Sequence, residues 1–132
     1  SKYIRYSDIK EGVNLQEYDI LILDNIGLLS NAYQYGSVAF IGGGFNNALH
    51  NILEPATFGL PVFYGNNHEK FPEANDMKLN GAGVDIEGYL DFEKELELIL
   101  EDKKLLAKKM ELNKNFIQSR TGATKLIYTH CI

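Results

Sequence analysis

The sequence predicts an α/β fold, a parallel sheet with flanking helices, and two observations lead to this prediction. Short apolar runs alternate with helical patterns along the chain, which is typical of parallel strands joined by helices. Three of the runs are almost continuously apolar, as strands covered on both faces of a sheet should be. These three runs lie at residues 19–23, 38–41 and 61–64.

The remaining elements follow from the same alternation. Weaker apolar runs stand near the start of the chain and after residue 83, and helical patterns fill the gaps between the runs. In chain order, we expect strands at residues 3–6, 19–23, 38–41, 61–64 and 84–86, and helices at residues 27–35, 48–58, 73–80 and 92–100. A second amphipathic pattern begins after Asp102, and residues 121–124 resemble the N-cap of a last short segment. The apolar stripe of that pattern consists of Leu105, Leu106, Met110 and Ile117.

The length of the chain indicates one domain. The 132 residues, 45% of them hydrophobic, are enough for one core and too few for two ordinary domains. The chain opens on a short polar strand and the turn Lys10-Glu11-Gly12, whereas a doubly wound nucleotide-binding domain opens on a long buried strand and a glycine-rich turn. We therefore expect residues 1–132 to form a single domain that is truncated at its N-terminal side.

Composition excludes several classes of protein. The formal net charge is −5, which disfavours a nucleic-acid partner because such binders carry a broad basic surface. The single cysteine, Cys131, rules out a disulfide framework or a Cys-rich zinc site and suggests a reducing compartment. The chain has no run of about 18 apolar residues and no signal-peptide pattern at Ser1. We expect a soluble chain that is not exported.

Charge is distributed unevenly near the end of the chain. Residues 85–102 contain eight acidic residues against Lys94, and residues 103–120 contain five lysines and Arg120 against Glu111. One interpretation is a pair of solvated helical faces that complement each other and the helix dipoles. The alternative is a basic stripe that rests on anionic lipid headgroups.

A glycine-rich turn is the main candidate for chemistry. Gly42, Gly43 and Gly44 directly follow an expected strand, where glycines allow close approach of a ligand to the backbone. Amides at the start of the next helix, expected near Ala48, would face that ligand, so an anion is the natural guest. The dinucleotide pattern G-x-G-x-x-G fails at Asn47, and no phosphate-binding G-x-x-x-x-G-K is present. A purely structural turn remains the alternative.

Glu54 strengthens the ligand interpretation. A carboxylate inside an apolar helical stretch, directly before Pro55, is costly to bury unless it has hydrogen-bond partners, and a vicinal diol would provide two. His50 and Asn51 stand one turn earlier and would share roughly the same helix face. In the alternative interpretation, Glu54 points to solvent or caps a neighbouring helix, and His50 and Asn51 are structural.

An ordered set of motifs resembles the C-terminal domain of 3-deoxy-D-manno-octulosonic acid (Kdo) transferases, which are GT-B glycosyltransferases of lipopolysaccharide synthesis. The resemblance covers the chain from about Asp19 to its end, and its most specific part is the string between Gly42 and Phe71. The motifs, as they stand here, are Asp24-x-x-Gly27, Ala39-Phe40-x-Gly42-Gly43, His50-Asn51-x-Leu53-Glu54-Pro55-Ala56, Gly59-x-Pro61-Val62, Gly65 and Phe71.

The resemblance implies a Rossmann-like domain, the C-terminal half of a GT-B enzyme, that holds the donor CMP-Kdo. It implies that Glu54 accepts hydrogen bonds from the ribose of CMP. Gly42, Gly43 and Gly44, together with His50 and Asn51, would surround the phosphate. His68 and Lys70, in the loop after the third main strand, are possible contacts of the Kdo carboxylate, with a solvated loop as the alternative.

The same resemblance implies the reaction and its place. The N-terminal domain of such enzymes holds the lipid A precursor and the catalytic base, so we expect no catalytic residue in this chain and no transfer by this chain alone. No metal or other cofactor is expected, because the sequence has no Asp-x-Asp cluster and His50, His68 and His130 lack ligand spacing. The full-length protein would work at the cytoplasmic face of the bacterial inner membrane.

The chain departs from the family pattern at five positions. Ala48 and Leu49 replace glycines, Leu28 replaces an acidic residue, Asn66 replaces a proline and Lys70 replaces an asparagine. These changes bear on the phosphate and sugar contacts. Two other functions remain open: another GT-B transferase or epimerase that uses a UDP-sugar, and a non-catalytic flavodoxin-like binding module.

Overall fold

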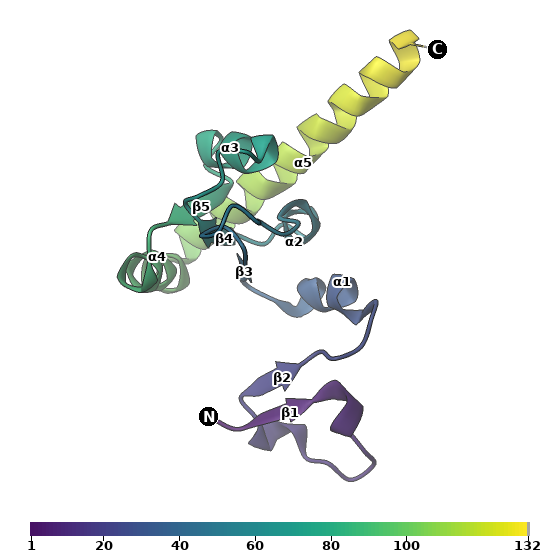
Figure 1. Cartoon of the computed structure of the whole chain (residues 1–132), viewed down its shortest axis with the longest axis vertical. Helices are drawn as coiled ribbons and strands as arrows, with labels where there is room; N and C mark the ends of the chain where they lie inside the picture. The colour runs from purple at the N-terminus through teal and green to yellow at the C-terminus, as the bar shows by residue number, and fades with distance from the viewer. Residues whose placement is uncertain (132) are drawn as a thin grey trace. The chain divides into compact units, whose positions relative to one another are not determined.

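The computed structural model describes the backbone of residues 1–131 and the side chains of residues 1–122. The chain divides into two compact units, Ser1–Gln34 and the chain from Tyr35 onward. Each unit contains a parallel sheet and helices (Figure 1). The predicted fold class, α/β with parallel strands and flanking helices, is confirmed.

The first unit is built on two short strands. β1 (Tyr3–Arg5) pairs in parallel with β2 (Ile20–Ile22), and the unit continues into helix α1 (Leu28–Ala32). Asp24 ties the turn after β1 to the end of β2, because its carboxylate accepts hydrogen bonds from the backbone N–H and the hydroxyl of Ser7 at 3.1 and 2.5 Å. The side-chain bond from Ser7 is the main cause that lowers the pKa of Asp24.

The prediction that residues 19–23 form a strand buried on both faces is wrong as to burial. Ile20, Leu21 and Ile22 form the strand but are 48%, 51% and 39% exposed. The physical reason is that β2 has only one partner strand in the described sheet, so the apolar side chains lack the layers that a larger parallel sheet supplies.

The second unit has a three-stranded parallel sheet in the order β3-β4-β5. Its strands are β3 (Ala39–Ile41), β4 (Val62–Gly65) and β5 (Gly83–Ile86). Its helices are α2 (Leu53–Thr57), α3 (Pro72–Leu79), α4 (Tyr89–Glu101) and α5 (Lys103–Cys131). The carboxyl ends of β3, β4 and β5 therefore meet at one edge of the sheet, where the predicted site lies.

The central strand β4 is buried throughout, and its side chains alternate between two hydrophobic clusters. Val62 and Tyr64 belong to the cluster that also contains residues of α2, α3 and α5. Phe63 belongs to the other cluster, where its ring and that of Phe92 of α4 form a T-shaped pair with centroids 5.3 Å apart. α5 packs against both α2 and α4. Of its predicted apolar stripe, Ile117 packs against the first cluster and Leu105 and Leu106 pack against the second.

The helix predicted at residues 48–58 is shorter than expected and spans only Leu53–Thr57. The cause is Pro55, which has no N–H and whose ring would clash with the carbonyl of Asn51 in a helix that began near Ala48. Proline is tolerated in the first turn, where amides have no helical partner. Asn51 lies before the helix, and its side-chain oxygen accepts a hydrogen bond from the N–H of Leu53, the first helical residue, at 3.0 Å.

The prediction of a new N-cap at residues 121–124 is also wrong, because α5 continues without interruption to Cys131. The Thr121 hydroxyl donates to the Ile117 carbonyl of the preceding turn at 3.0 Å, so it is satisfied inside the helix and does not cap a new one. The side chains of Ala123 and Thr124 lie outside the described residues. Within the described part of the chain, no helix is both long and apolar enough to span a bilayer.

Candidate functional site

The glycine turn after β3 is closed by its own backbone. The N–H groups of Asn46 and Ala48 both donate to the Gly43 carbonyl, at 3.1 and 3.0 Å, and the His50 N–H donates to the Gly42 carbonyl at 3.2 Å. Gly43 has a φ of +88°, which a residue with a Cβ rarely adopts. The amides of Ala48 and His50 are used within the turn, so the expectation that a helix beginning there presents them to an anion is wrong.

Gly44 brings this turn into contact with the end of β4. A Cβ added to Gly44 would lie 2.6 Å from the Gly65 nitrogen, and one added to Gly65 would lie 2.7 Å from the Phe45 nitrogen. The contact therefore requires glycine on both sides. Asn67 stabilises the contact between the turn and β4, because its N–H donates to the Gly44 carbonyl at 2.8 Å and its side-chain amide donates to the Phe45 carbonyl at 3.3 Å.

The residues predicted to accompany the glycines lie in the segment that follows the turn. His50 is exposed, and its ring is the nearest group that a Cβ on Gly42 would meet, at 3.9 Å. Asn51 is exposed and accepts a hydrogen bond from the Leu53 N–H at the start of α2, and Glu54 is the second residue of that helix and is partly exposed. His50 and Asn51 precede the helix, so they do not share a helix face with Glu54 as predicted.

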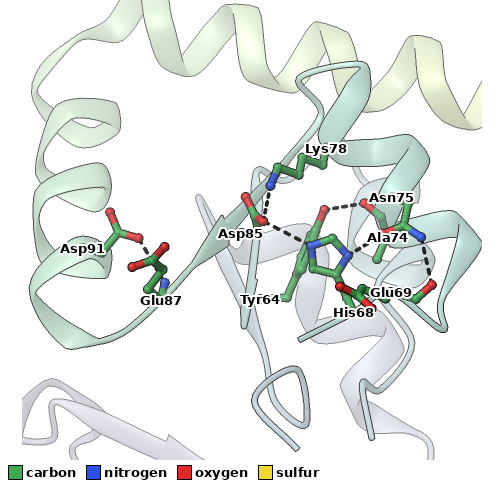
Figure 2. A network of polar contacts seen from close by, with 9 residues as sticks. All are labelled: Tyr64, His68, Glu69, Ala74, Asn75, Lys78, Asp85, Glu87 and Asp91. Carbon is green, nitrogen blue, oxygen red and sulfur yellow. Dashed lines mark hydrogen bonds and ion pairs between the residues drawn. The ribbon is translucent and has the colours of Figure 1, made fainter. Parts of the chain in front are cut away.

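The structure separates the two candidates of the loop after β4. Lys70 is exposed, whereas the side chain of His68 is buried in a polar network (Figure 2). Nδ1 of His68 lies 2.7 Å from Oδ1 of Asn75, and Nε2 lies 3.2 Å from Oδ2 of Asp85. Contact of His68 or Lys70 with a sugar stays a prediction, and Lys70 has the more accessible side chain of the two.

Asp85 is the residue of this network that sequence reasoning missed. Its Oδ2 accepts a hydrogen bond from Nζ of Lys78 at 2.6 Å as well as facing His68. Burial alone would raise the pKa of Asp85, but the hydrogen bonds from Lys78 and His68 outweigh it, so the pKa lies below its ordinary value. A carboxylate between Val84 and Ile86 in an apolar strand was the sequence signal that could have found it.

Tyr64 packs against the network. Its ring and the His68 ring are in a T-shaped arrangement with their centroids 5.2 Å apart, and its hydroxyl donates to the Ala74 carbonyl at 2.8 Å. Burial, with the nearby charge of Asp85, raises the pKa of Tyr64 far above its ordinary value, so the hydroxyl remains a hydrogen-bond donor. Gly83 on β5 makes room for this ring, because a Cβ there would collide with the Tyr64 hydroxyl.

A shallow apolar pocket of about 260 Å³ opens at the same edge of the sheet, between the glycine turn and α4. Its lining residues are Phe40, Phe45, Ile86, Gly88, Tyr89 and Phe92. Among the described residues, no group of three or more histidine, cysteine, aspartate or glutamate side chains is placed to hold a metal ion.

Comparisons with known proteins agree with this geometry. No family model matches the sequence. The chain is 34% identical over 98 residues to the 3-deoxy-D-manno-octulosonic acid transferase of Aquifex aeolicus (strain VF5), a match that covers 73% of this chain and 26% of that protein. The chain is related to the Kdo transferases. It thus spans about a quarter of the length of this curated Kdo transferase.

Two further comparisons extend over more of the chain. A bifunctional glycosyltransferase/methyltransferase of Fusobacterium nucleatum subsp. nucleatum is 27% identical over 127 residues, which are 95% of this chain and 19% of that protein. The crystal structure of the C-terminal CMP-Kdo binding domain of WaaA from Acinetobacter baumannii has a TM-score of 0.73 and 21% sequence identity, and the match covers 89% of this chain and 61% of that one. The predicted resemblance to the C-terminal domain of a GT-B Kdo transferase is confirmed in sequence and in fold.

The contact between Gly44 and Gly65 predicts different effects for two neighbouring glycines. Gly44→Ala should lower the free energy of unfolding by about 1–3 kcal/mol, because the new methyl group would overlap the Gly65 backbone. Gly42→Ala should change it by less than about 0.5 kcal/mol, because its Cβ meets nothing closer than 3.9 Å. Urea denaturation of both variants measures the difference, and equal losses would contradict the proposed backbone contact.

The lowered pKa of Asp85 predicts a pH dependence of stability. A carboxyl group whose pKa is lowered by folding stabilises the fold above its ordinary value of 3.8 and loses this contribution as the pH falls through the folded-state pKa. Asp85→Asn should therefore lower the melting temperature at about pH 7, and the gap to the wild type should close toward about pH 3. A gap that stays constant over this range would show that the ionised form of Asp85 contributes nothing.

Proposed function

We propose that this chain is the donor-binding domain of a Kdo transferase, which binds CMP-Kdo and presents it for transfer of Kdo to a lipid A precursor. The observation that carries the proposal is the glycine turn itself. Its exposed first glycine, Gly42, lies next to the ring of His50, at the carboxyl edge of a parallel sheet, and the segment that follows the turn leads to Glu54. Ligands of open α/β sheets bind at this edge.

Glu54 is proposed to hold the ribose of CMP. A carboxylate accepts hydrogen bonds from both hydroxyls of a vicinal diol, and its charge makes each bond roughly twice as strong as a neutral one. The position of Glu54 at the start of α2, partly exposed, leaves its carboxylate within reach of a ligand from solvent.

The phosphate is proposed to lie over Gly42, Gly43 and Gly44, beside His50 and Asn51. The absence of a side chain at Gly42 allows the phosphate to approach the backbone there. The side-chain oxygen of Asn51 is engaged by the Leu53 N–H, so its amide nitrogen is the group that would donate to a phosphate oxygen. The imidazole of His50 is exposed beside Gly42 and would be a second donor.

The proposed reaction forms a bond between an acceptor hydroxyl oxygen and the anomeric carbon of Kdo, and breaks the bond from that carbon to the CMP phosphate. A base in the N-terminal domain of such enzymes takes the hydroxyl proton, and hydrogen bonds to the phosphate stabilise the leaving CMP. Transfer therefore needs both domains, and this chain contributes the donor half.

The partner of α5 is proposed to be the anionic surface of the inner membrane, on its cytoplasmic face. Lys103, Lys104 and Lys108 are exposed near the start of α5. Lys109 differs, because its Nζ donates to the Gly81 carbonyl at 2.9 Å and burial lowers its pKa. The three exposed lysines near the start of α5 are thus the ones that we propose to attract lipid headgroups.

Glu54→Gln in the full-length protein should weaken CMP binding by about ten- to a hundredfold. The amide keeps the shape of the side chain but presents a donor where the second ribose hydroxyl also donates, which costs about 1.5–3 kcal/mol of interaction. The melting temperature without ligand should change little. Calorimetric titration of CMP together with thermal melts measures both quantities.

Two results would contradict the ribose role. One is equal CMP affinity in wild type and variant, and the other is a large loss of stability with unchanged affinity, which would mean that Glu54 only braces α2. Titration of UDP and UDP-sugars in parallel separates the proposed donor from the alternative of a UDP-sugar enzyme. A protein that binds none of these nucleotides would be the non-catalytic module.

Neutralising Lys103, Lys104 and Lys108 to Gln in the full-length protein should reduce binding to vesicles rich in anionic lipid. Each lysine near such a surface contributes about 1 kcal/mol, so the loss should be on the order of a hundredfold at low salt and smaller at high salt. Lys94→Gln on α4 is the control for a lysine outside this stripe. Vesicle cosedimentation measures the effect. Unchanged binding after the triple substitution would contradict the membrane role and favour the alternative in which the lysines lie on a solvated helical face.

A further inference from the structure

The loop between β4 and α3, residues 66–71, contains no helix or strand. It is tied to its surroundings by backbone bonds at two points: the Asn66 N–H donates to the Ile86 carbonyl at 3.0 Å, and the Asn67 N–H donates to the Gly44 carbonyl at 2.8 Å. The Phe71 N–H donates back to the His68 carbonyl at 2.9 Å and closes the turn. The place of Lys70 depends on how this loop is held.

His68 anchors the loop through both nitrogens of its ring (Figure 2). Nδ2 of Asn75 donates to the Glu69 carbonyl at 3.2 Å, which turns Oδ1 of Asn75 toward Nδ1 of His68, 2.7 Å away. Nε2 of His68 faces Oδ2 of Asp85 at 3.2 Å. Each ring nitrogen therefore faces an oxygen acceptor, one on α3 and one on β5.

The side chain of His68 is enclosed by its partners. Its side chain is 6% exposed, and three titratable groups face the ring or its partners: Asp85 from β5, Lys78 from α3 and Tyr64 from β4. Lys78 shares Oδ2 of Asp85 with His68, so the carboxylate is held from two sides. A ring enclosed in this way acts on the site through the segment that carries it.

We propose that His68, with Asn75 and Asp85, is a positioning residue for the donor site: it fixes residues 66–71 against the glycine turn and thereby places Lys70 at the edge of the sheet. The part of this inference that concerns the donor rests on the proposed function. The part that concerns the loop stands on the hydrogen bonds alone, because His68 joins the loop to α3 and β5 while the adjacent residue, Asn67, joins it to Gly44.

Three substitutions in the full-length protein separate the contributions of the two ring-nitrogen contacts of His68, with Asn75 and with Asp85. His68→Asn keeps a donor near the position of Nδ1 and so the bond to Asn75, whereas His68→Gln keeps a donor near the position of Nε2 and so the bond to Asp85. His68→Ala removes both. Asn113→Ala is the matched control, because Asn113 is a buried amide that donates to the Ala82 and Lys109 carbonyls at 2.8 Å, far from the loop in sequence.

The first readout is hydrogen exchange at the Asn67 amide, relative to the Ala39 amide, which donates to the Pro61 carbonyl at 2.9 Å between β3 and β4. The second is the affinity for CMP. His68→Ala should speed exchange at Asn67 and weaken CMP binding, each by about tenfold, as expected for the loss of a hydrogen bond or two. His68→Asn and His68→Gln should each restore part of both effects, and Asn113→Ala should lower the melting temperature while leaving both unchanged.

The outcomes distinguish this inference from the proposed function. Unchanged exchange at Asn67 in His68→Ala overturns the positioning role. Faster exchange with unchanged CMP affinity overturns its importance for the donor. A third outcome is that the wild type binds no CMP although His68→Ala still speeds exchange at Asn67. This result overturns the proposed function and leaves the anchoring of the loop intact.

Discussion

The backbone contact between Gly44 and Gly65 is the constraint on which the rest of the site depends. Adjacent parallel strands bring their carboxyl ends together, but side chains ordinarily keep the following loops apart. Here both residues lack a Cβ, so the turn after β3 and the loop after β4 touch, and Asn67 bonds across the contact. The segment with His50, Asn51 and Glu54 and the loop with Lys70 consequently leave the sheet from one place.

The polar network beneath the loop adds order to this arrangement. Tyr64, His68 and Asp85 come from β4, the loop and β5, and each is satisfied by a partner from α3. Burial of such groups is costly unless they are hydrogen-bonded, so the network favours one conformation of the loop over alternatives that would leave a donor or acceptor unpaired. The sheet, α3 and the loop thus form one structural unit behind the candidate donor site.

Much of the fold could be predicted from sequence because apolar runs and glycines signal strands and their ends directly, as at Val62 and Gly65. The apolar pattern places the start of α2 too early, because it does not report the clash between the Pro55 ring and the carbonyl of Asn51 that a longer helix would contain. The partners of His68 could not be predicted, since Asn75 and Asp85 meet it only after β4, α3 and β5 have packed. The exposure of β2 depends on which layers pack on the faces of its sheet, and periodicity does not report this.

The most direct test of the account is an NMR titration of the isotope-labelled protein with CMP, read at the backbone amides. The account predicts that the largest shifts cluster at Gly42–Gly44, at His50–Glu54 and in the loop that carries Lys70, with UDP producing weaker shifts at the same places. Shifts that cluster on α4 and α5 instead, or an absence of shifts at the glycine turn when CMP saturates the protein, would contradict it.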